Sequence, residues 1–294
     1  MTVDVSEGRR TIRWRRPLVG ILFGLPSFVY FALWVFVPIG YGIWESLTND
    51  SLLGSPSFVG LANYTTAFSD PQFWHTVERT FEYGGVAVVP TLVIGLAIAI
   101  LLNGVRTGQQ VYLMGLFLPV VVPSISAALV WELILQPAGL LNATIGTNLS
   151  WLLDPSVSLI AVGMVTVWSA VGYYVVVFLA GLQNIPTDVI EAGAIDGARR
   201  LQTFWYLVAP LLRPTILFAT VTSTAAVVTN FTLPFVLTNG GPGDATLTMP
   251  LLIYREAFSY SQAGFGQALA MILLVFAIVL TLIQFRLLGR SVQL

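Results

Sequence analysis

The residue types that most often do catalytic chemistry are scarce in this sequence. His75 is the only histidine among 294 residues, cysteine is absent, and all 13 basic residues are arginine. A serine–histidine–aspartate site or a two-histidine metal site would need residues that the chain mostly lacks, and the phosphate loop of nucleotide hydrolases needs a lysine. We therefore expect no catalytic residue, no metal site and no cofactor bound by this chain. A membrane-embedded enzyme is the weaker alternative.

Charged residues gather instead in one short segment. Between Pro155 and Gly243 every charged residue falls within 188–213. These residues are Asp188, Glu191, Asp196, Arg199, Arg200 and Arg213. Pro186 suits the first turn of a helix, and acidic residues near that turn favour the positive end of the helix dipole. The small residues Ala192, Gly193 and Ala198 leave few protruding side chains, so another protein can pack closely against this surface. The segment therefore predicts an exposed docking helix, and a solvated loop is the alternative.

The rest of the chain predicts an all-α integral membrane protein. It is 56% hydrophobic and only 9% charged, whereas a soluble domain is about 25% charged. Six uncharged runs each exceed the roughly 20 residues that cross a bilayer. We expect spans at about 17–44, 83–105, 107–131, 157–183, 214–238 and 262–285 within one transmembrane domain, 17–294, with a loop at 184–213. The uncharged stretches 51–69 and 133–153 are rich in Ser, Asn, Gly or Pro and are expected as loops.

The arginines predict the orientation of these spans. With residues 1–16 as a cytoplasmic segment, eleven of the 13 arginines fall inside and only Arg79 and Arg255 fall outside. Membrane proteins carry such an excess of basic residues in their cytoplasmic segments. Both termini and the loop 184–213 are therefore expected in the cytoplasm. The net charge of −1 gives no basic field for a nucleic acid, so none is expected as a partner.

The docking segment resembles a known motif. It contains Glu191-Ala192-Gly193, then Gly197 after three residues, then Leu207-Val208-Ala209-Pro210 after nine more. This is similar to the EAA motif of permease subunits in bacterial binding-protein-dependent ABC importers, which reads Glu-Ala-Ala, three residues, Gly, nine residues, Ile-x-Leu-Pro. The chain departs from the pattern at Gly193, Leu207 and Ala209, which are small or apolar replacements.

Three further stretches, 58–64, 235–258 and 266–270, resemble the maltose and glycerol-phosphate type of carbohydrate permease, so that the resemblance covers nearly the whole chain. The cluster Gly240-Gly241-Pro242-Gly243 lies in the second of them. Glycine-rich loops can cradle phosphate, but this one follows a span on the outer side. We expect a tight turn there that meets a solute-binding protein.

The resemblance implies a division of labour. A second homologous permease would complete a heterodimer, a cytoplasmic ATPase dimer would hold ATP and Mg, and an extracytoplasmic solute-binding protein would deliver a sugar. The assembly would lie among the lipids of the bacterial inner membrane. The resemblance implies that the 184–213 segment couples to the ATPase through Asp188, Glu191, Ala192, Gly193, Asp196, Gly197, Arg199 and Arg200.

The solute should meet polar and aromatic side chains within the spans. Our candidates for the pathway are Trp168, Tyr173, Tyr174, Ser223, Thr229 and Asn230, with Trp131 and Glu132 near its outer end. Aromatic rings suit the apolar faces of a sugar, and amides suit its hydroxyls. Ser223 and Asn230 are two helical turns apart, so one helix face can carry both. The alternative is that these polar groups hold helices together.

Other transport roles remain as alternatives. A permease for glycerol phosphates or another polyol is the nearest, although the expected spans contain no arginine to bind a phosphate. A stand-alone secondary carrier would need an internal repeat and ionisable groups at mid-membrane. A role as a structural scaffold would not account for the EAA spacing.

Overall fold

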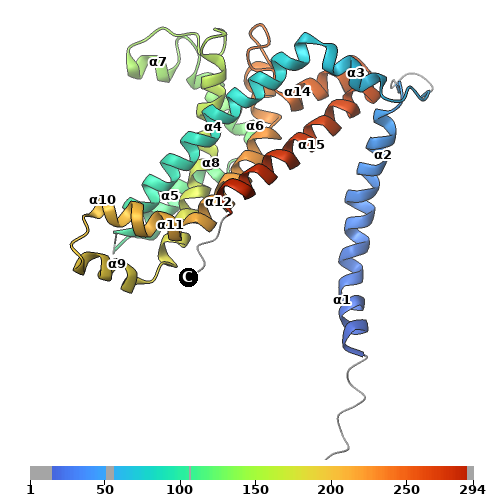
Figure 1. Cartoon of the computed structure of the whole chain (residues 1–294). Coiled ribbons are helices and arrows are strands. Elements are labelled where there is room, and N and C mark those ends of the chain that lie inside the picture. Colours follow the sequence, from blue (N-terminus) through green and yellow to red (C-terminus); the bar gives the residue numbers. More distant parts are fainter. Residues whose placement is uncertain (1–14, 51–55, 106, 290–294) are drawn as a thin grey trace, which may run out of the picture.

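The computed structural model describes residues 15–50, 56–105 and 107–289. The predicted segment 1–16 lies almost wholly outside this range, as do Arg106 and Arg290. The described part of the chain is built from helices, and its one extended pairing is an isolated bridge between Thr48 and Phe58. The all-α class is therefore confirmed (Figure 1).

The first half of the chain contains α1 (Arg15–Phe31), η1 (Ala32–Phe36), α2 (Val37–Ser46), α3 (Ala62–Ser69), α4 (Pro71–Asn103), α5 (Gln109–Val121), α6 (Ser124–Ile134) and α7 (Leu140–Ile145). The second half contains α8 (Ser158–Gln183), α9 (Thr187–Ile195), α10 (Arg200–Thr203), η2 (Phe204–Val208), α11 (Ala209–Leu211), α12 (Arg213–Val228), α13 (Thr232–Thr238), α14 (Met249–Tyr254), η3 (Arg255–Ser259) and α15 (Ala263–Leu288).

Several helices are long and apolar enough to cross a membrane. Four qualify alone, at Phe23–Ser46, Pro71–Asn103, Ser158–Gln183 and Ala263–Leu288. Two further pairs qualify together but are bent, α5 with α6 by 95° and Arg200–Leu211 with α12 by 69°. The protein thus has four candidate spans, or six if each bent pair is one span. The number of six and the side on which the termini lie stay predictions.

Two of the expected helices differ in the structure. α4 begins at Pro71, well before the expected residue 83, because the Asp70 side chain accepts a hydrogen bond from the backbone nitrogen of Gln72 at 2.8 Å and Pro71 fits the first turn. The uncharged run 107–131 is broken after Val121, where Val122 and Pro123 are extended. A proline disfavours helical geometry in the residue before it, so the chain turns sharply there.

Two of the three buried clusters lie along α4 and α8, which pack against each other in the bundle, and the third joins α3 and α14 to α15 (Figure 1). Tyr83, Ala87, Val162 and Val165 are fully buried between α4 and α8. A β-carbon placed on Gly163 would lie 2.5 Å from the Cγ1 of Val86. Small residues at such crossings let membrane helices approach closely, which stabilises their packing in lipid.

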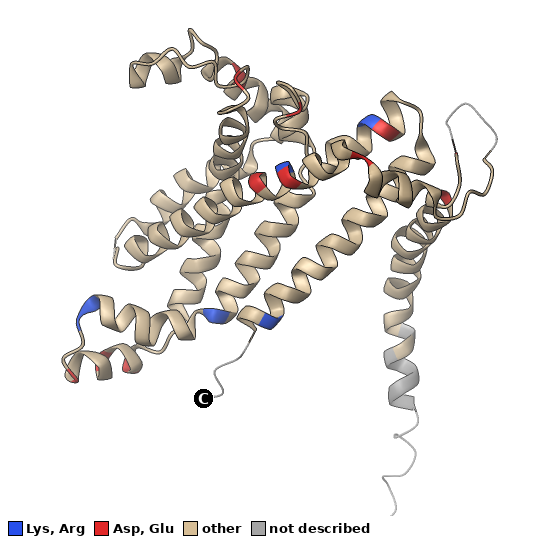
Figure 2. Cartoon of the chain, turned by 45° about the horizontal axis from the view of Figure 1, so that its top comes forward, with Lys and Arg blue, Asp and Glu red and all other residues tan. Residues whose placement is uncertain are grey.

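Charged residues lie at the two ends of this bundle, with helices free of charge between them (Figure 2). The start of α1, the α9–α11 segment and the end of α15 share one end, while α3, α7 and α14 lie at the other (Figure 1). We name these the coupling end and the outer end, after the role and the side that the sequence predicts for them. A charge-free middle between charged ends is typical of a protein embedded in a bilayer.

The stretch 58–64 fastens the outer end of the first long helix. The Asn63 side chain donates hydrogen bonds to the carbonyl oxygens of Ser46 at 2.9 Å and Thr48 at 2.8 Å. The Tyr64 hydroxyl lies 2.7 Å from the Ser46 hydroxyl, and the ring of Phe58 stacks on Trp44. These contacts satisfy carbonyl groups that the end of α2 leaves open.

Candidate coupling helix and translocation pathway

The predicted docking segment forms a helix with a defined end. α9 follows Pro186, carries Asp188 in its first turn and stops before Gly197, which has a φ of +76°. The nitrogen of Ala198 donates to the oxygen of Gly193 at 3.0 Å, and the nitrogen of Gly197 donates to the oxygen of Ala194 at 3.1 Å. This is the Schellman arrangement, which needs a left-handed residue after the helix. Glycine adopts that conformation without steric cost, which accounts for Gly197.

A second glycine brings α9 against the helix that follows. A β-carbon placed on Gly193 would lie 2.6 Å from the Cδ1 of Leu207 in η2. Gly193 is buried, whereas most of its neighbours in α9 are exposed. Two departures from the EAA pattern are therefore in contact. The Leu207 side chain occupies the space that the methyl group of an alanine at 193 would need.

The outward surface of the segment is charged and accessible. All the charged residues assigned to coupling, Asp188, Glu191, Asp196, Arg199 and Arg200, are exposed, and no ion pair within the described residues joins them. Beside them, Ile195 and Tyr206 are 86% and 78% exposed. Sequence reasoning missed these two, although large apolar side chains in a polar surface segment are the signal of a binding surface.

A groove of about 490 Å³ runs between α9 and the α10–η2 segment. Its lining includes Asp188, Ala192, Asp196, Gln202 and Tyr206. The groove brings together the acidic face of α9 and the exposed tyrosine, so the segment offers a shaped surface with polar and apolar groups.

Near the middle of the bundle, a smaller cavity of about 140 Å³ is lined by hydroxyl and amide groups. Its polar lining residues are Thr91, Ser124, Thr166, Ser169, Tyr174, Ser223 and Asn230. We name it the polar pocket. The structure brings together three predicted pathway residues here, Tyr174, Ser223 and Asn230. Sequence reasoning missed Thr91 on α4, Ser124 on α6, and Thr166 and Ser169 on α8.

The other three predicted pathway residues lie elsewhere. Trp168 packs edge-on against Trp131 with ring centroids 5.6 Å apart. Tyr173 is 39% exposed on α8. The Thr229 hydroxyl donates to the carbonyl oxygen of Ala225 at 2.8 Å in its own helix. None of them is among the residues that line the polar pocket.

Two interrupted helices meet at the polar pocket. Ser124 begins α6 after the sharp bend, and Asn230 lies in the break between α12 and α13. The Asn230 side chain donates to the hydroxyl of Tyr83 at 3.0 Å, and this hydroxyl lies 2.7 Å from that of Thr166. Broken helices at membrane depth are tolerated where they line a cavity. Asn230 therefore both lines the pocket and holds helices together. A purely structural role for this residue thus remains the alternative to contact with the solute.

The family of the chain follows from its sequence. The profile described as "Binding-protein-dependent transport system inner membrane component" matches residues 91–293. The chain belongs to this family. It is the inner-membrane permease subunit of an ATP-driven importer, whose ATPase is a separate subunit. A stand-alone carrier and a structural scaffold do not agree with this membership.

Curated relatives match almost end to end. A probable ABC transporter permease protein of Bacillus subtilis, YesP, is 32% identical over 96% of this chain and 94% of its own length. The sn-glycerol-3-phosphate transport system permease protein UgpA of Brucella abortus is 34% identical over 91% of this chain and 94% of its own. The trehalose/maltose transport system permease protein MalF of Thermococcus litoralis is 30% identical over 94% and 95%.

The fold matches that of solved importers. A chain of a bacterial ABC transporter involved in the import of the acidic polysaccharide alginate superposes with a TM-score of 0.80, covering 95% of this chain and 98% of that one. A chain of the alginate transporter in complex with its pentasaccharide-bound periplasmic protein gives 0.81 over 94% and 97%. Both are 19% identical to this chain, so the likeness concerns the fold.

Proposed function

We propose that this permease forms, with a second and non-identical permease, the pathway for a neutral sugar or oligosaccharide that an external binding protein delivers. A cytoplasmic ATPase dimer, which holds ATP and Mg, would grip α9. The observation that carries this proposal is the acidic, exposed α9, capped at Gly197 and packed through Gly193 onto the helix that leads to the polar pocket.

The path from α9 to the polar pocket is short. Gly193 contacts Leu207, and the α10–η2–α11 segment then bends by 69° into α12. α12 carries Ser223 and ends just before Asn230, both of which line the polar pocket. A partner that moves α9 when nucleotide binds would therefore shift one wall of the pocket. Such a shift is how a ligand on one side can favour one state of a helix bundle.

The chemistry of the polar pocket supports a neutral solute. Its lining offers hydroxyl groups, one amide and the Tyr174 ring but no arginine. An anion away from water needs a cation or many donors to offset its lost hydration. The alternative, a glycerol phosphate or another polyol, is favoured by the name of the Brucella relative. It requires that the second permease supply the positive charge.

Transport assays on the assembled importer test both parts of the proposal. The complex is reconstituted in lipid with its binding protein, and ATP hydrolysis and uptake are measured across saccharides and glycerol phosphates. We expect neutral saccharides to stimulate hydrolysis. Stimulation by glycerol phosphates alone would contradict the sugar assignment.

The variant Glu191→Ala tests coupling in the same assay. We expect at least a tenfold loss of uptake per ATP hydrolysed, or failure to retain the ATPase, while the protein still inserts. The matched control is Glu78→Ala, which removes an exposed acid at the outer end. Normal uptake by Glu191→Ala would count against the role of α9.

A further inference from the structure

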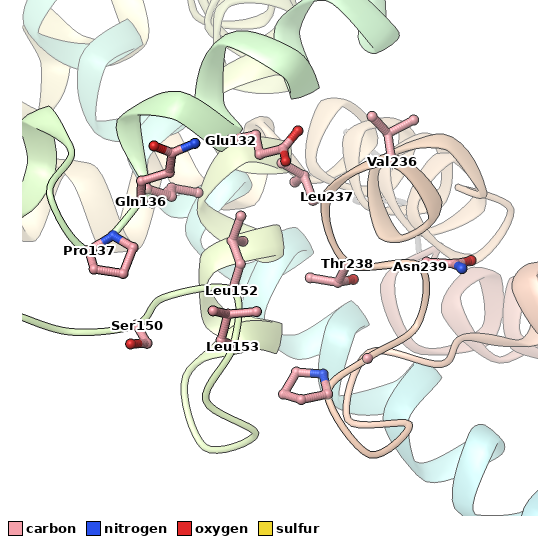
Figure 3. A pocket seen from close by; sticks show the side chains of 13 residues that line it. Glu132, Gln136, Pro137, Ser150, Leu152, Leu153, Val236, Leu237, Thr238 and Asn239 are labelled. Carbon is pink, nitrogen blue, oxygen red and sulfur yellow. The ribbon is translucent and has the colours of Figure 1, made fainter.

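The outer end carries a second cavity, separate from the polar pocket and lined by Glu132, which is predicted from the sequence to lie near the outer end of the pathway. It measures about 430 Å³ and lies between the end of α6, the turn at 150–153 and the end of α13 with its following loop (Figure 3). We name it the outer cup. Its polar lining residues are Glu132, Gln136, Ser150, Thr238 and Asn239, and the others are apolar apart from Gly241. The outer cup and the polar pocket share no lining residue.

Glu132 is the one charged residue among those that line the outer cup. Its side chain lies between Gln136 and the α13 residues Val236 and Leu237 (Figure 3). Within the described part of the chain, no hydrogen bond or ion pair engages its carboxylate. The Glu132 carboxylate is half-buried, and the side chains around it in the outer cup carry no positive charge. The charge of the cup is therefore negative and uncompensated.

The rim of the outer cup is held in place before any partner arrives. The Arg255 side chain donates to Asp244 Oδ1 at 2.8 Å and to the carbonyl oxygen of Asn239 at 2.6 Å. On the opposite side, the buried Asn142 donates to the carbonyl oxygen of Leu149 at 2.8 Å and accepts from Trp151 Nε1 at 2.9 Å. These bonds fix the loops on both sides of the cavity. A preformed cavity binds without the cost of ordering its walls.

We propose that the outer cup receives one basic side chain, an arginine or lysine, from the extracytoplasmic solute-binding protein. This inference rests on the proposed function, because it needs a partner that docks on the outer end. The Glu132 carboxylate would pair with the cationic group, and the amide oxygen of Gln136, which lies beside Glu132 in Figure 3, can accept a further hydrogen bond. The apolar walls, including Leu152 and Pro242, suit the aliphatic stem of such a side chain.

Charge complementarity selects this occupant. A neutral sugar would leave the carboxylate without a counter-charge, and an anionic solute would be repelled by it. A basic side chain of a docking protein satisfies the charge and the apolar walls together. The contact would anchor the binding protein at a fixed place on the outer end.

The test uses the complete importer in lipid nanodiscs and the binding protein that stimulates its ATP hydrolysis. The Kd of that binding protein is measured for the wild type, for Glu132→Gln and for Glu132→Arg. We expect Glu132→Gln to weaken binding about tenfold to a hundredfold, the range for loss of a charged hydrogen bond, and Glu132→Arg to weaken it further. The wild-type Kd should rise with salt more steeply than that of Glu132→Gln.

Glu78→Gln is the matched control, because it removes an equal charge from an exposed position on α4 outside the outer cup. It should change the Kd less than twofold. Equal melting temperatures of the variant complexes exclude misfolding as the cause. A charge reversal of one basic residue on the binding protein should restore the binding lost in Glu132→Arg.

The outcomes separate this inference from the proposed function. A wild-type complex that no binding protein stimulates overturns both. A stimulated wild type with the same Kd for Glu132→Gln and Glu78→Gln overturns the outer cup alone. A Glu132→Gln complex that needs more solute but binds the binding protein normally shows a solute site, and this also overturns the proposal.

Discussion

Gly193 and Leu207 are in contact between α9 and η2, and the size of each side chain limits the size of the other. A methyl group at 193 would come within 2.6 Å of the Leu207 side chain as it now lies. A leucine can move its tip by changing rotamer, but only at the expense of its packing elsewhere. The residue type tolerated at position 193 therefore depends on the residue at position 207.

This contact predicts a non-additive pair of variants. Gly193→Ala alone should lower the uptake of the complex severalfold, because α9 is displaced from η2. The double variant Gly193→Ala, Leu207→Ile restores the residue types of the EAA pattern at both positions and should recover most of that loss. The measurement is uptake per ATP hydrolysed for the two single variants and the double variant, with additive losses as the contrary result.

Gly197 gives a second prediction at the same scale. An alanine there must adopt a φ of +76°, which costs about 1 kcal/mol. We expect Gly197→Ala to lower the melting temperature of the complex and to weaken retention of the ATPase. Gly146→Ala, which imposes a similar left-handed strain (φ +70°) at the end of α7, is the control and should leave retention of the ATPase unchanged.

The pH response of the outer end depends on Glu256, which is only 9% exposed. Burial, with the carboxylate of Asp70 nearby, raises the pKa of Glu256 above its usual value of 4.5, and Arg255 opposes this in part. The raised pKa means that the charged form destabilises the folded state. This penalty is absent below about pH 4.5, grows as the pH rises to the folded pKa, and is complete above it.

The variant Glu256→Gln should therefore melt at a higher temperature than the wild type at pH 7. The difference should shrink as the pH falls towards 4.5. Melting curves of the purified complex across this range provide the check, and a variant that is less stable at neutral pH would contradict the assignment.

At the scale of elements, the contacts of residues 58–64 with the end of α2, here called the joint, give a testable prediction. Asn63 donates two hydrogen bonds to backbone carbonyls at the end of α2, and each contributes about 0.5 to 1.5 kcal/mol. Asn63→Ala should thus loosen the end of the first long helix without altering the polar pocket. Protease sensitivity of the 46–62 region should increase, whereas Thr65→Ala, an exposed neighbour in α3, should not change it.

Sequence patterns predicted some elements better than others. The bounds of α8 and α15 lie within a few residues of the uncharged runs 157–183 and 262–285, because polar residues and turns end those runs where the helices end. α4 differs because its polar turns, including the ion pair of Arg79 with Glu82 at 2.6 Å, continue the helix beyond the apolar run. The break at Asn230 was missed because its side chain caps the next helix, and an asparagine within an apolar run gives no sign of this.

At the scale of the whole molecule, the helix at 187–195 could be predicted from the sequence, whereas the polar pocket could be predicted only in part, through Tyr174, Ser223 and Asn230. α9 is a contiguous stretch whose charges and glycines are visible in the sequence. The polar pocket draws one hydroxyl residue each from α4, α6 and α12 and three from α8, and hydroxyl residues are common in every span. Only the crossing of α4 and α8 and the two helix breaks bring them together. The outer cup likewise depends on loops that are distant in sequence.

The first long helix has a consequence for how this permease is made. Its apolar window, within Phe23–Ser46, has no buried residue, and its side chains at Phe23 and Trp34 are 81% and 71% exposed. Among the candidate spans of this sequence, this helix is synthesised before the others, and its apolar surface favours insertion without the later helices. The joint at Asn63 can close only after α3 has been synthesised. During biogenesis, the first helix should therefore insert into the membrane before the later helices are made. A pulse-chase assay of truncated nascent chains would detect this intermediate.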